Sequence, residues 1–148
     1  MNWRQHQHVK KTFGKWNERG SVAVEFALIL PILLALVFGV IDFGRLLYTY
    51  ETINNAAREG ARVGIKMRAV PVTDAEITTQ VNTLIDGSQL ADSSHATVAI
   101  NRVNVGTSVN LQVGVQYNFA FLVANALIPG LPQTRVMNAT SIMRMEGT

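Results

Sequence analysis

The chain has 148 residues, a net charge of +3 and no cysteine. This length allows one compact domain besides a membrane anchor, and the lack of thiols excludes disulfides and thiol chemistry. The first 20 residues hold five basic side chains and one acidic one, whereas residues 43–148 hold eight basic and seven acidic ones. Because the basic surplus is almost confined to the leader, nucleic-acid binding is not predicted.

A long apolar segment follows the basic leader. Residues 22–41 are apolar apart from Glu25, and as a helix they would be about 30 Å long, enough to cross the hydrocarbon core of a bilayer. We therefore predict a leader over residues 1–20 and a transmembrane helix over residues 21–42. Since Lys and Arg gather on the N-terminal flank, the leader is expected in the cytoplasm and the rest of the chain outside.

The junction between the leader and the apolar segment carries a candidate processing site. No small-x-small site of a secretory signal follows the apolar run, so the plausible cut lies before it, between Gly20 and Ser21. Glu25 would lie about 6 Å along the helix from Ser21, where a charge is costly. Its carboxylate either pairs with the new α-amino group of Ser21, on this or a neighbouring subunit, or reaches the headgroups. We favour the first interpretation, an assembly role.

Small residues recur through the apolar segment at a spacing of four. This row predicts a face where another membrane helix packs closely, although alanine and glycine are common in membrane helices generally. Its proline removes one backbone donor, which predicts a kink or a locally melted turn. The row consists of Ala23, Ala27, Pro31, Ala35 and Gly39.

The helix is expected to continue beyond the membrane as a stalk over residues 43–66. No proline interrupts this stretch, and its apolar residues follow a helical spacing. Ala56, Gly60 and Gly64 fall four apart, which predicts that another element packs against the helix backbone there. On the charged side, Glu59 and Arg62 lie three residues apart, within reach of each other.

Residues 67–148 are predicted to form a small extracytoplasmic domain. Thr73 and Glu76 fit a capping box that opens a short amphipathic helix closing at Gly87. Strict alternation over 109–121 is the pattern of a half-buried strand, and shorter strands are expected over 96–100 and 135–145. The predicted fold class is α+β: a long N-terminal helix, then one short helix and a three- to four-stranded antiparallel sheet.

The sequence contains no pattern typical of catalysis. It lacks a phosphate-binding glycine loop, a nucleophile elbow and metal-type His spacing, so no enzyme activity, cofactor or metal is predicted. His95 follows Asp92, Ser93 and Ser94, an arrangement that suggests a triad but is more often a solvated loop. His6 and His8 are spaced for a possible metal contact, but they belong to the leader and have no further ligands nearby.

Three blocks in order carry a family resemblance: Gly20 to Pro31, Gly39 to Arg45, and Ala56 to Arg62. The first resembles the class III signal of type IV pilins, and together they resemble the TadE family of minor pseudopilins over residues 19–65. The resemblance implies cleavage by a prepilin peptidase after Gly20. It also implies partnership with other pilin-like subunits and with the membrane machinery of a tight-adherence (Flp-type) pilus, in the bacterial inner membrane.

Two other functions stay open. The first is an untrimmed single-pass envelope adaptor, whose outer domain binds a partner. The second is a pseudopilin of a type II secretion machine, which the blocks ending at Pro31 and Arg62 disfavour. Cleavage after Gly20 would separate the pilin-like function from the adaptor.

Overall fold

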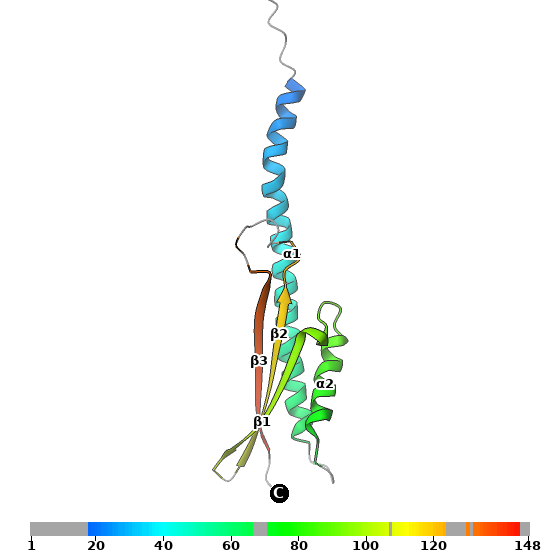
Figure 1. Ribbon diagram of the computed structural model, residues 1–148, viewed down its shortest axis with the longest axis vertical. Helices are drawn as coiled ribbons and strands as arrows, with labels where there is room; N and C mark the ends of the chain where they lie inside the picture. Colours follow the sequence, from blue (N-terminus) through cyan, green and yellow to red (C-terminus); the bar gives the residue numbers. More distant parts are fainter. Residues whose placement is uncertain (1–17, 67–70, 107, 124–129, 131, 146–148) are drawn as a thin grey trace, which may run out of the picture. The chain divides into compact units, whose positions relative to one another are not determined.

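The structure is a computed structural model that describes residues 18–66, 71–106, 108–123, 130 and 132–145. Its helices are α1 (Glu18–Gly64), α2 (Asp74–Asp86) and the short 3-10 helix η1 (Ser93–His95). Three strands follow them, β1 (Ala96–Val105), β2 (Ser108–Ala120) and β3 (Thr134–Met145) (Figure 1). The α+β class predicted from the sequence, with its long apolar helix and antiparallel sheet, is confirmed. The chain divides into two compact units, residues 1–34 and 35–148, with the boundary inside α1.

In the first unit, α1 is an isolated helix with an apolar surface. Every residue from 20 to 34 is exposed. Helix α1 is long and apolar enough to cross a membrane, and its most apolar 18 residues have a mean hydropathy of 2.7. Pro31 lies inside the helix, which continues through it, so the melted turn considered from the sequence is not observed.

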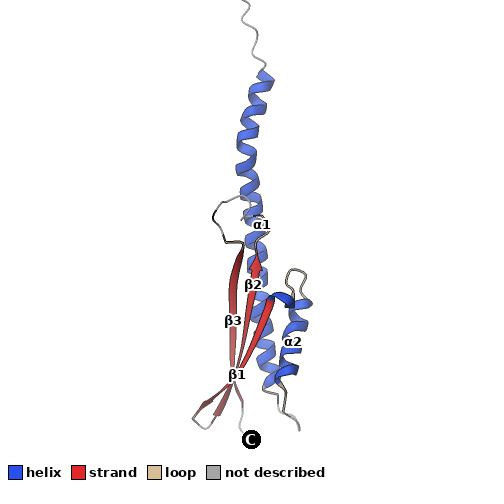
Figure 2. Ribbon diagram, in the orientation of Figure 1, coloured by secondary structure: helices blue, strands red, loops and turns tan. Residues whose placement is uncertain are grey.

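The second unit contains the sheet, in which each strand pairs with the next one in the sequence. The order is β1-β2-β3 and both pairings are antiparallel (Figure 2). Val113 in the central strand lies opposite Ile100 on one side and Ser141 on the other. β1 runs five residues beyond the predicted 96–100, because its pairing with β2 continues to the turn at Gly106, where φ is +63°.

One face of the sheet and the two helices enclose the hydrophobic core. The alternation in β2 places Leu111, Val113, Val115, Tyr117 and Phe119 on this face, all buried, as the sequence predicts. β3 adds Met137 and Ala139 to the same cluster. The helical contribution comes from Ile53, Ala56, Ala57 and Ala61 of α1 and from Ile77, Val81 and Ile85 of α2.

The predicted capping box at the start of α2 is confirmed. The backbone N–H of Glu76 donates to the Thr73 hydroxyl over 3.3 Å, and the Glu76 carboxylate accepts the Thr73 N–H over 2.9 Å. This reciprocal pair satisfies two of the N–H groups that a helix start leaves without partners. An ion pair of 2.6 Å between Asp74 and Arg102 connects the same turn to β1.

Candidate processing and assembly site

The predicted cut falls in the first turn of α1. The helix begins at Glu18, and both Gly20 and Ser21 are exposed. A Cβ at Gly20 would meet no atom within 4 Å. The first turn of a helix lacks intrahelical partners for its N–H groups and unwinds more readily than the interior. Residues 1–17 of the leader, including His6 and His8, lie outside the described residues.

Glu25 lies one helical turn after Ser21 and is exposed in the first unit. Among the described residues, the structure gives its carboxylate no hydrogen bond or ion pair. In a bilayer, an acid at this position needs a partner because the hydrocarbon layer offers no solvation. The α-amino group that a cut before Ser21 would create lies about 6 Å along the same helix.

The row of small residues is exposed at one end and partly covered at the other. Ala23, Ala27 and Pro31 are exposed, whereas Ala35 and Gly39 are half-buried. The first three therefore offer a surface to another helix, and the last two share the side of α1 that continues into the core. All five residues follow one sequence pattern, but the first part of the row is exposed and the last part is partly covered.

Asp42 was not predicted to be a functional residue, yet it connects α1 to the end of β2. Only 2% of the residue is exposed. Its carboxylate oxygens accept the backbone N–H groups of Leu122 and Val123, both over 3.1 Å, and the guanidinium of Arg45 over 3.1 Å. The same guanidinium lies 5.2 Å from the centre of the Phe119 ring, a cation–π distance. We call this arrangement the Asp42 clasp. The only sequence signal for it is an acid and a base three residues apart in an apolar helix.

The glycines of the stalk lie against the chain's own outer elements. Ala56 is fully buried, and Gly60 and Gly64 are buried beside it. A Cβ at Gly60 would lie 2.5 Å from Val81 of α2, and one at Gly64 would lie 2.8 Å from Ile77. Their lack of a side chain lets α2 approach the backbone of α1 closely.

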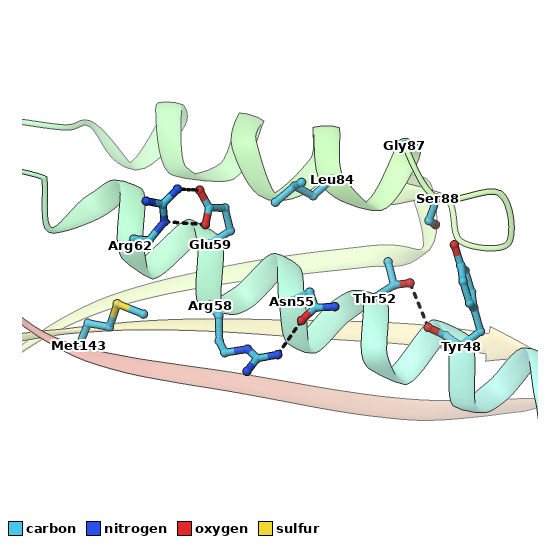
Figure 3. A pocket seen from close by; sticks show the side chains of 10 residues that line it. All are labelled: Tyr48, Thr52, Asn55, Arg58, Glu59, Arg62, Leu84, Gly87, Ser88 and Met143. Atoms are coloured by element: carbon cyan, nitrogen blue, oxygen red, sulfur yellow. Dashed lines mark hydrogen bonds and ion pairs between the residues drawn. The ribbon is translucent and has the colours of Figure 1, made fainter.

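A groove of about 610 Å³ runs along the exposed side of α1 in the second unit, bordered by Leu84 of α2 and Met143 of β3 (Figure 3). In it, Arg62 donates two hydrogen bonds to Glu59, one of them 2.7 Å long, as the predicted spacing allows. These bonds hold the pKa of the Glu59 carboxyl below its usual value. Arg58 donates to Asn55 over 2.6 Å. The charged side chains of the groove are thus engaged with neighbouring residues of α1, and the described residues that line it include no nucleophile hydrogen-bonded to a base.

The loop around His95 does not form a triad. The hydroxyl and backbone N–H of Ser93 both donate to Asp86, and Asp92 accepts the backbone N–H of Ser94 over 2.8 Å. This bond to Ser94 lowers the pKa of Asp92. The His95 ring is exposed and lies edge-on to Tyr117. The described residues also contain no group of three or more His, Asp or Glu side chains placed to hold a metal ion.

Within its described residues, the chain thus has one apolar helix long enough to cross a membrane, and the second half of this helix contributes to the core of a small α+β unit. The family model of the TadE-like proteins matches residues 20–62, which confirms the resemblance read from the sequence. The match begins at the candidate cut and ends near the last turn of α1. No curated protein and no solved structure matches the chain.

Proposed function

We propose that the protein is a minor pilin-like subunit, or an assembly factor, of a tight-adherence pilus. The TadE-like family is associated with this pilus, and the match over residues 20–62 is the observation that carries the proposal. It covers the candidate cut at Gly20, the acid at Glu25 and the whole apolar segment. Within this function, a prepilin peptidase on the cytoplasmic side cuts after Gly20, and the chain assembles with sibling pilin-like subunits through α1.

The exposure of α1 supports assembly through its first half. Residues 20–34 are all exposed and present mostly apolar side chains. In a bilayer, the face formed by Ala23, Ala27 and Pro31 allows close approach of another helix. The carboxylate of Glu25 pairs with the amine of Ser21 on this or the neighbouring subunit and fixes the register of packing.

The first test is the intact mass and N-terminal sequence of the membrane-extracted protein, with and without a co-expressed prepilin peptidase. We expect a peptidase-dependent start at Ser21, and Gly20→Val should retain the leader. Gly39→Val is a matched control, since a Cβ at either glycine would meet no atom within 4 Å. A leader retained in the wild-type chain would instead favour the untrimmed envelope adaptor.

The second test addresses Glu25. Glu25→Gln keeps the shape of the side chain but removes the charge that the new amine needs, so we expect normal trimming and reduced pilus output. Glu51→Gln, the same change at an exposed acid of the same helix, serves as the control for a general effect of losing an acid. Pilus output from Glu25→Gln equal to that of the wild type would reject the pairing.

A further inference from the structure

Helix α1 exposes no fully accessible charged side chain between Glu25 and Glu51. The two charged side chains in between are Asp42, which is buried, and Arg45, whose side chain is 22% exposed and lies over Phe119. Residues 26–50 would rise about 37 Å along a helix, which exceeds the hydrocarbon core of about 30 Å. The apolar surface of α1 therefore extends beyond the end of the predicted span at residue 42.

This surface ends in a pair of tyrosines. Tyr48 and Tyr50 are 44% and 43% exposed, and Phe43 and Leu47 before them are also exposed. Tyrosine is enriched where a membrane helix leaves the hydrocarbon, because its ring is apolar and its hydroxyl is polar. By this criterion the interface lies at Tyr48 to Tyr50, about two turns beyond Asp42.

The outer unit adds two further apolar side chains along this stretch of α1, beside Asp42 and Arg45. Leu122 is 63% exposed, and its backbone N–H is bonded to Asp42. Leu90 is 45% exposed and borders a hollow of about 480 Å³ that Arg45 also lines. Figure 1 shows the end of β2 and the loop between α2 and η1 at the same end of the sheet, opposite the β1–β2 turn. We call the following set the membrane rim: Phe43, Leu47, Tyr48, Tyr50, Leu90 and Leu122.

We propose that the membrane rim lies in the headgroup region of the lipid bilayer, so that the outer unit sits directly on the membrane. A bilayer fits the rim because its α1 residues continue the apolar surface of the candidate span without an exposed charge before Glu51. On the outer unit, the exposed acid Asp92 lines the same hollow as Leu90, which suits a headgroup region and not the hydrocarbon. An unpaired acid at position 42 would oppose this placement, but the Asp42 clasp pairs it. Its carboxylate is already satisfied by two N–H groups and one guanidinium, so no unpaired charge enters the interface. The inference rests on membrane anchoring through α1 and is independent of trimming.

Tryptophan fluorescence tests the placement cleanly. Both tryptophans of the chain, Trp3 and Trp16, belong to the leader, so the full chain carrying Trp3→Phe and Trp16→Phe has none. Single tryptophans are then introduced by Leu122→Trp, Leu90→Trp or Tyr48→Trp. The control is Val105→Trp, at an exposed residue next to the opposite turn. Each variant is reconstituted in phosphatidylcholine vesicles, with and without lipids brominated near the top of the acyl chain.

We expect brominated lipid to reduce the emission of the rim tryptophans about twofold and to leave the control unchanged, because only the rim reaches the interface. Equal emission changes at positions 122, 90 and 105 would overturn the proposal. So would a tryptophan at position 48 that acrylamide quenches and brominated lipid does not, since the interface would then lie nearer Asp42. Shielding from both quenchers would also overturn it, because a second protein copy would then cover the rim.

The same samples separate this inference from the proposed function. Their N-terminus is determined after treatment with prepilin peptidase. A retained leader together with quenching of the rim tryptophans by brominated lipid would reject the pilin-like pathway and support the placement of the membrane rim. A trimmed chain whose rim tryptophans are not quenched by brominated lipid would support the pilin-like pathway and reject the placement of the membrane rim. Circular dichroism of each variant shows whether the outer unit is folded, and the two independent positions, Leu122 and Leu90, keep the test decisive if one of them disturbs the fold.

Discussion

Rows of small residues spaced four apart occur at both ends of α1, but the two rows lie in different surroundings. Ala23 and Ala27 are exposed, whereas Ala56 and Gly60 are buried under α2 and β2. The second end finds its partner within the chain, and the first end does not. A row of small residues therefore indicates a close-packing face without telling whether the partner is intramolecular. Substitutions along α1 test this contrast.

The largest effect is expected from filling the buried end. Gly60→Val should destabilise the outer unit by about 3 kcal/mol, because overpacking a stiff neighbour such as Val81 forces the backbone to shift. Gly44→Val, on an exposed and open site of the same helix, is the control and should leave stability unchanged. Denaturant unfolding in detergent, followed by circular dichroism, measures both. Equal free energies of unfolding for the two variants would show that the buried site on α1 tolerates a larger side chain as well as the exposed site does.

The Asp42 clasp is the next test, because it lies where the exposed part of α1 gives way to the buried part. Asp42→Ala leaves two backbone N–H groups and Arg45 without this acceptor and should lower the free energy of unfolding by about 2 kcal/mol. Asp42→Asn, which keeps one acceptor oxygen, should fall between the wild type and Asp42→Ala. Glu51→Ala, an exposed acid on the same helix, should have no effect.

A gain in stability is expected from Thr49. This residue is fully buried, and its hydroxyl is the buried side-chain group without a hydrogen-bond partner in the described part of the chain. Thr49→Val keeps the volume and removes the unpaired polar group, so unfolding should become about 1 kcal/mol less favourable. Thr52→Val is the comparison, because the Thr52 hydroxyl already donates to the Tyr48 carbonyl over 2.9 Å and its loss should bring no gain.

The smallest effect belongs to the ion pair on the exposed side of the stalk. Arg62 lowers the pKa of Glu59, so the pair stabilises the fold above the ordinary carboxyl pKa and loses this contribution as the pH falls through the lowered value. Glu59→Gln should therefore unfold slightly more easily than the wild type at neutral pH, and the two should converge in acid. Both side chains are partly solvated, which keeps the difference small.

Local patterns in the sequence predicted much of the fold. The capping box of Thr73 and Glu76 and the alternation of β2 depend on neighbours within a few residues, and both are confirmed. The Asp42 clasp joins groups 80 and 81 residues apart, so no periodicity or spacing reveals it. The glycine spacing at Gly60 and Gly64 showed that something packs there, but the identity of that partner required the fold.

The order of the strands has a consequence for how the protein is made. Each strand pairs only with its neighbour in the sequence, and such local pairings close short loops and form early. The buried end of α1 differs, because its glycines need β2, about 50 residues later, before they are covered. During synthesis the second half of α1 therefore precedes the elements that cover it, and the sheet forms against a helix that has already been made.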